Sequence, residues 1–207
     1  MSTISAPSAP IAQRVLLDLV PRTLVRDIVA VVGFALLTAA AAQVSIPLGF
    51  TPVPLTGQTF AVLLAGGVLG ANRGGLSQLL YVAMGAVGLP FYADGASGLT
   101  ANGTVIPTIG YLLGFVVAAW VVGLMAERQQ DRNLLTSIPA FLAGTVVIYV
   151  IGASVLAWQL DIPFAADLDE ASALKFGIAP FVIGDVIKAV AAGAILPGAW
   201  KVSERLR

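Results

Sequence analysis

Uncharged segments long enough to cross a membrane follow one another along the chain. Four stretches contain no Asp, Glu, Lys or Arg: residues 28–72, 74–93, 95–126 and 133–160, which are 45, 20, 32 and 28 residues long. A hydrocarbon layer about 30 Å thick needs about 20 helical residues, so the first stretch has room for two short crossings and each of the others for one. A last apolar segment, from Ile178 to Trp200, adds a sixth crossing.

Proline residues divide the longest uncharged stretch. Pro47, Pro52 and Pro54 interrupt it, because proline cannot continue a helix beyond its first turn. The Ala-rich run before them ends near Val44, and the run after them begins near Thr56. We therefore predict an all-α polytopic membrane protein with six transmembrane helices, of which the second and third are short for a full span. The helices are expected near residues 27–44, 56–71, 74–88, 107–126, 138–160 and 178–200.

Composition supports a membrane protein and excludes several kinds of chemistry. The chain has 207 residues, of which 58% are hydrophobic and 11% charged, and its mean hydropathy is +0.94. Eleven basic and eleven acidic residues give a net charge of zero, so no basic excess points to nucleic acid. The sequence contains no Cys and no His, which excludes disulfides, thiol nucleophiles, Cys/His zinc sites and His-based catalytic triads. We expect neither a metal nor a cofactor.

The basic residues give the orientation, because Lys and Arg concentrate on the cytoplasmic side of membrane proteins. With six helices, nine of the eleven fall on one side, which is then cytoplasmic together with both termini. These nine are Arg14, Arg22, Arg26, Arg73, Arg128, Arg132, Lys201, Arg205 and Arg207. We expect a cytoplasmic tail over residues 1–26, a membrane domain over 27–200 and a second tail over 201–207. The first tail lacks the apolar core of a signal peptide and has room for an interfacial helix between Val15 and Leu24.

Two ionisable residues stand within the last predicted helix. Asp185 and Lys188 are three residues apart, which places them on one face, where they can pair with each other or hold a ligand together. Ionisable side chains inside a membrane are energetically costly and usually face a cavity or a partner, so we predict a binding site. The alternative is an ion pair with a purely structural role.

The loop over residues 45–59 is predicted to lie outside the membrane, yet it is uncharged and rich in Pro and apolar residues. We expect it to fold over the mouth of the bundle as a lid, with Thr56, Gln58 and Thr59 forming hydrogen bonds at its inner edge. A plug that rests on lipid headgroups is the alternative. A second external segment contains Phe91, Asp94 and several glycines and leads to Tyr111, so it can close the same pocket, although aromatic residues near helix ends are also common at membrane interfaces.

The first predicted helix carries small residues four positions apart. Ala35 and Ala39 form a strip against which another helix can pack closely. From the residues alone, packing within the chain is the preferred interpretation over contact with another protein.

Several motifs in order along the chain resemble those of the BioY family, the biotin-specific substrate-binding (S) components of energy-coupling factor (ECF) transporters. They are Thr51-Pro-Val-Pro-Leu-Thr-Gly-Gln-Thr59, Leu64-Ala-Gly66, Leu69-Gly70, Gly88-Leu-Pro90, Gly110-Tyr-Leu-Leu-Gly-Phe115 and Gly184-Asp185 with Lys188. The resemblance covers about residues 28 to 200. One departure is Ile109, where the family usually has a second glycine before the tyrosine.

The resemblance implies a six-helix protein of a bacterial or archaeal cell membrane that binds biotin from outside and is not an enzyme. It implies that Asp185 and Lys188 contact biotin, with Asp94, Tyr111, Gln58, Thr56 and Phe91 as further candidates. The expected partners are a transmembrane T component, which would dock on Ala35 and Ala39, and two ABC-type ATPases, because the chain has no GxxxxGK[ST] phosphate-binding loop. Whether the protein works alone or as a homo-oligomer stays open. The alternative function is a self-sufficient channel or an ion-coupled carrier for a small molecule.

Overall fold

The computed structural model describes residues 15–101, 103–166 and 170–205, and helices dominate them. The α-helices are α1 (Leu24–Ala42), α2 (Gln58–Leu69), α3 (Ala71–Ala86), α4 (Ile109–Glu127), α5 (Leu134–Leu160), α6 (Ala173–Gly177) and α7 (Val182–Arg205). Short 3₁₀ turns are η1 (Leu16–Leu19) and η2 (Ala93–Gly95). Two antiparallel strand pairs join β1 (Ser45–Ile46) to β2 (Leu55–Thr56) and β3 (Thr100–Ala101) to β4 (Thr104–Val105).

The all-α class is confirmed, and each of the six predicted helical ranges overlaps one of the longer helices. Four helices, α1, α4, α5 and α7, are long and apolar enough to cross a membrane. The second and third are shorter, as predicted: α2 has 12 residues and α3 has 16. The start of α5 differs from the prediction, because the Asn133 side chain caps the helix by accepting the main-chain N–H of Thr136, and Pro139 lies inside it.

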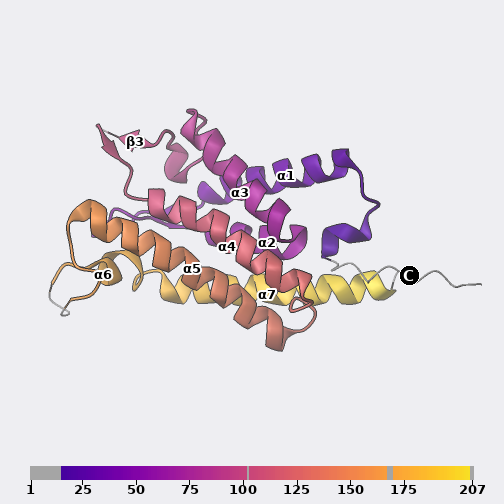
Figure 1. Cartoon of the computed structure of the whole chain (residues 1–207). Coiled ribbons are helices and arrows are strands. Elements are labelled where there is room, and N and C mark those ends of the chain that lie inside the picture. Colours follow the sequence, from indigo (N-terminus) through magenta and orange to yellow (C-terminus); the bar gives the residue numbers. More distant parts are fainter. Residues whose placement is uncertain (1–14, 102, 167–169, 206–207) are drawn as a thin grey trace, which may run out of the picture.

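Helix α4 lies at the centre of the bundle, between α3 and α5 and against α2 (Figure 1). Small residues allow its main chain to come close to its neighbours. A Cβ atom on Gly123 would lie 2.3 Å from the main-chain nitrogen of Ala71, and one on Gly66 would lie 2.5 Å from the carbonyl oxygen of Ala119. The tight α2–α3 connection is therefore pressed against α4, with Gly70 in the left-handed region at φ +83°.

The N-terminal segment packs on the bundle, and a 3₁₀ turn lies in the range where the sequence has room for an interfacial helix. Leu16–Leu19 is a 3₁₀ turn, and Val15 before it is buried. Asp18 forms ion pairs with Arg22, Arg26 and Arg73, at 3.5, 3.9 and 3.0 Å. These charges tie the turn to α1 and α3. The tail over residues 1–14 and Arg207 lie outside the described residues.

The Ala35 and Ala39 strip is buried where α1 packs against α2 and α3, with exposed fractions of 0% and 5%. The hydroxyl of Thr38 between them donates to Gln78 of α3 at 3.2 Å. In this structure the strip serves packing within the chain, and docking of a partner on it stays a prediction.

Candidate functional site

A cavity lies between the β1–β2 loop, the η2 turn and helices α2, α4, α5 and α7. It comprises about 570 Å³, counting the part that opens to solvent. Its lining is mostly apolar. The lining residues are Val53, Pro54, Leu55, Thr56, Gln58, Thr59, Tyr92, Ala93, Thr108, Tyr111, Leu112, Phe115, Ile148, Tyr149, Phe181, Asp185 and Lys188.

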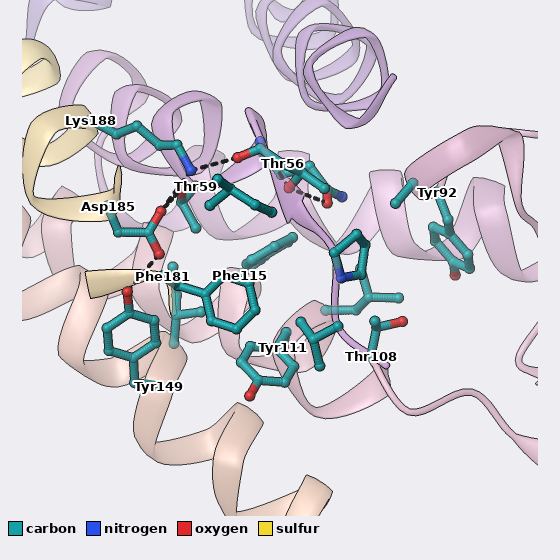
Figure 2. A pocket seen from close by; sticks show the side chains of 17 residues that line it. Thr56, Thr59, Tyr92, Thr108, Tyr111, Phe115, Tyr149, Phe181, Asp185 and Lys188 are labelled. Atoms are coloured by element: carbon teal, nitrogen blue, oxygen red, sulfur yellow. Dashed lines mark hydrogen bonds and ion pairs between the residues drawn. The ribbon is translucent and has the colours of Figure 1, made fainter. Parts of the chain in front are cut away.

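Asp185 is the centre of a polar cluster at one end of the cavity (Figure 2). Its Oδ1 accepts hydrogen bonds from the hydroxyl of Thr59 at 2.8 Å and from Lys188 Nζ at 2.7 Å. Its Oδ2 accepts the hydroxyl of Tyr149 at 2.7 Å. The side chain is only 5% exposed, so three donors from α2, α5 and α7 replace the water that an ionised carboxylate would otherwise require.

Lys188 joins α7 to the loop that covers the cavity. Besides its ion pair with Asp185, its Nζ donates to the main-chain carbonyl of Thr56 in β2 at 2.6 Å. Burial of a charge is costly unless it is paired and hydrogen-bonded, and both conditions hold here. The two residues form the ion pair that their spacing allows, and both side chains also line the cavity, which a purely structural pair does not require.

Gln58 and Thr56 hold the N-terminal end of α2 in place. The hydroxyl of Thr56 donates to Gln58 Oε1 at 2.8 Å, and Gln58 Nε2 donates to the hydroxyl of Tyr81. The amide therefore has partners on both sides, and Gln58 is 5% exposed. Its rigid placement sets the position of Thr59, whose hydroxyl reaches Asp185.

Hydrogen bonds to main-chain carbonyls hold the cover of the cavity in place. The hydroxyl of Tyr111 donates to the carbonyl of Gly177 at 2.8 Å, and that of Thr51 donates to the carbonyl of Phe176 at 2.7 Å. The ring of Tyr111 lies against Gly152, where a Cβ atom would come within 2.3 Å of it. These bonds join the loop over residues 45–57 to α6, and α6 to α4.

The middle and far end of the cavity differ from the Asp185 end. Phe115 and Phe181 lie in the middle, and Tyr92 and Thr108 lie at the end opposite Lys188 (Figure 2). Tyr92 donates its hydroxyl to the carbonyl of Val82 at 2.7 Å, and burial raises the pKa of its phenol. The cavity therefore has one charged end, an apolar middle and a neutral far end.

Of the seven predicted ligand contacts, five line this cavity: Asp185, Lys188, Tyr111, Gln58 and Thr56. Phe91 and Asp94 do not, although the adjacent Tyr92 and Ala93 do. Phe91 is half-buried and packs against the apolar core. Asp94 has a φ of 57° in η2 and accepts a hydrogen bond from the hydroxyl of Ser45 at 3.2 Å, which ties η2 to the loop over residues 45–57.

Tyr149 is the main residue that sequence reasoning did not select. It lies within the helix predicted over residues 138–160, where a tyrosine among apolar residues reads as ordinary core. The usable signal was its hydroxyl, because a buried phenol needs a hydrogen-bond partner and this helix offers no polar side chain one turn away except Thr145. Among the described residues, no group of three or more His, Cys, Asp or Glu side chains is arranged to hold a metal ion.

Comparison with known proteins agrees with the resemblance. The sequence profile of the BioY family matches residues 11–205. The biotin transporter BioY of Thermotoga maritima is 40% identical over 162 residues, which cover 78% of this chain and 88% of that protein. The biotin transporter BioY of Rhizobium etli is 36% identical over 178 residues, 82% of this chain and 90% of that one.

A solved structure has the same fold. The crystal structure of the S-component for biotin from an ECF-type ABC transporter superposes with a TM-score of 0.72 at 25% sequence identity. The match covers 87% of this chain and 95% of that chain. The likeness therefore extends over the helices that form the cavity.

Proposed function

Because this chain belongs to the BioY family, we propose that it is a membrane-embedded biotin-binding protein that captures the vitamin and serves its uptake. It is a transport protein, as the related biotin transporters are, and not an enzyme. The observation that carries the proposal is the covered, mostly apolar cavity with a single ion pair, Asp185 and Lys188, at one end.

The chemistry of biotin fits this cavity. Its fused rings carry a ureido group, with two N–H donors and one carbonyl acceptor, and an apolar thioether. Asp185 can accept a ureido N–H, and Lys188 can donate to the ureido oxygen, while Phe115 and Phe181 provide apolar surface for the thioether ring. Removal of these groups from water strengthens each hydrogen bond and penalises a ligand that leaves one unmade.

The charged end is better suited to the ureido ring than to the valerate. A carboxylate that approached Lys188 would also meet Asp185, whose Oδ1 lies 2.7 Å from Lys188 Nζ, and two like charges at such a distance repel each other. We therefore place the valerate towards Thr108 and Tyr92, at the far end.

We further propose six membrane spans, with α2 and α3 as short ones, and both termini in the cytoplasm of a cell membrane. The distribution of arginine and lysine supports this orientation. Large apolar side chains on the surface of the bundle, such as Val29 and Ile187, each 64% exposed, support the membrane spans, because lipid would cover them. With this orientation the cavity opens on the outer side.

A T component and two ABC-type ATPases are the proposed partners for energised uptake. The crystal structure that this fold matches is of an S-component from an ECF-type ABC transporter. The chain itself has no phosphate-binding loop, so it requires another protein to hydrolyse ATP. Because Ala35 and Ala39 are buried, docking on them would require α1 to shift from α3.

Calorimetric titration of the detergent-purified chain with biotin tests the proposal, with thiamine and riboflavin as control ligands. We expect one-to-one binding of biotin and no binding of either control. A folded preparation that does not bind biotin would overturn the proposed function. Asp185→Asn and Lys188→Ala proteins with undiminished biotin affinity would remove this pair from the site while leaving the function in place.

A further inference from the structure

The ammonium group of Lys188 lies between two acceptors that belong to different parts of the chain (Figure 2). On one side is the main-chain carbonyl oxygen of Thr56, at 2.6 Å, and on the other is the carboxylate of Asp185, at 2.7 Å. All three residues line the cavity. The wall therefore presents an acceptor, a donor and an acceptor in sequence.

Each member of this row retains hydrogen-bonding capacity for a ligand. An ammonium group has three donors, and Lys188 uses two of them. A carbonyl oxygen has two lone pairs, and Thr56 uses one for Lys188. In Asp185, Oδ1 accepts from both Thr59 and Lys188 and is saturated, whereas Oδ2 accepts only from Tyr149 and has one lone pair left.

We propose that this row recognises the ureido edge of biotin as a unit, with the main-chain carbonyl of Thr56 as the acceptor for the second ureido N–H. The inference rests on the proposed function and adds a specificity-determining group to it. A cyclic urea presents a donor, an acceptor and a donor along one edge, which is the complement of Thr56, Lys188 and Asp185. The unused lone pair on each flanking acceptor takes one N–H, and the third donor of Lys188 takes the carbonyl.

Recognition by a main-chain carbonyl has a consequence for how the lid and the ligand interact. Thr56 belongs to β2, at the inner end of the loop over residues 45–57, so the second N–H of the ligand would bond directly to the lid. The same arrangement disfavours a carboxylate at this end, because two of the three wall groups are acceptors. It also disfavours a ring whose carbonyl is replaced by a donor, which would face the ammonium of Lys188.

The test compares biotin with two analogues, each methylated at one ureido nitrogen, by titration calorimetry. For the natural chain we expect either methyl group to weaken binding about tenfold to hundredfold, because each leaves a buried acceptor without its donor. In the Asp185→Ala protein, the penalty for one methyl group should disappear and the penalty for the other should persist. Dethiobiotin, which keeps the ureido edge, is the control for the loss of the ring sulfur.

Thr56 can be observed directly, because Thr56-Gly57 is the only Thr-Gly pair in the sequence. Labelling threonine carbonyls with ¹³C and glycine nitrogens with ¹⁵N gives one carbonyl resonance for this peptide bond in an NMR experiment that selects bonded pairs. Saturating biotin should shift that resonance. The analogue whose methyl group costs affinity even in Asp185→Ala should not reproduce the shift.

Two results would overturn the inference. One is a natural chain that tolerates a methyl group on either nitrogen, and the other is a Thr56 resonance that biotin leaves unchanged. Neither measurement needs a variant, so poor folding of Asp185→Ala would not obscure them. A natural chain that binds no biotin at all would instead overturn the proposed function, and the inference with it.

Discussion

Replacement of Lys188 with methionine keeps most of the side-chain length but removes the charge that balances Asp185. The variant loses two hydrogen bonds, to Asp185 Oδ1 and to the carbonyl of Thr56, and leaves a carboxylate that is 5% exposed without its counter-ion. Removal of one partner from a buried ion pair typically costs about 3–5 kcal/mol. The Lys188 side chain is 20% exposed, and Thr59 and Tyr149 still donate to Asp185, so we expect about 3 kcal/mol, the low end.

Thermal unfolding in detergent without biotin, followed by the fluorescence of the three tryptophans, measures this loss. A change of 1 kcal/mol shifts the midpoint of a chain of this size by about 2–4 °C, so Lys188→Met should lower it by about 6–12 °C. Lys201→Met, at an exposed position of α7, is the matched control and should leave the midpoint unchanged.

The double variant Asp185→Asn/Lys188→Met decides whether the buried charge is the cause. A neutral asparagine can still accept from Thr59 or Tyr149, so the double variant should regain most of the lost stability although it binds biotin no better than the single one. If the double variant is as unstable as Lys188→Met, the loss comes from packing or from the bond to Thr56. The electrostatic reasoning for this site would then be refuted.

Three further outcomes are expected. Gly123→Ala should reduce the folded fraction in size-exclusion chromatography, because its Cβ would lie 2.3 Å from the main-chain nitrogen of Ala71, whereas Gly33→Ala, with nothing within 4 Å, should not. Burial raises the pKa of Asp131, and the indole N–H of Trp200 opposes this rise. A carboxyl whose pKa is higher in the folded than in the unfolded protein makes the fold less stable as the pH rises from the unfolded-state pKa to the folded-state pKa. The midpoint of Trp200→Phe should therefore fall more between pH 4 and 7 than that of the natural chain. Finally, the chain alone in liposomes should bind biotin but show no ATP-dependent accumulation; accumulation with ATP and no added protein would contradict the absence of a phosphate-binding loop.

The helices were predictable because the length of an uncharged segment is a local property. A span needs a certain number of apolar residues whatever surrounds it, and α1, α4, α5 and α7 meet that requirement. The start of α5 was not predicted, because the cap at Asn133 acts through one side chain. The pairing of Ser45 with Thr56 in the lid was also missed, because strands of two residues are too short to show an alternation of apolar and polar residues in the sequence.

The candidate site was predictable in proportion to how unusual its residues are in a membrane helix. Asp185 and Lys188 stand out by charge alone. Tyr149 does not, because its importance comes from a partner 36 positions away, and only the packing of α5 against α7 brings them together. Phe91 and Asp94 were placed at the right loop but not at the cavity, because one residue of register in an irregular turn decides which side chain faces inward.

The lining of the cavity and its cover are made by the same contacts, and this bears on how a ligand can leave. Lys188 bonds to Thr56 of the lid, and the hydroxyl of Thr51 in the same loop bonds to the carbonyl of Phe176 at the end of α6. A ligand held by Asp185 and Lys188 therefore adds to contacts that already keep the lid closed. Opening must break these bonds together, so tight capture and rapid release are opposed within this chain. Under the proposed function, release would then need free energy from outside the chain, which is a physical reason to propose an ATP-hydrolysing partner for a binding protein without a phosphate-binding loop.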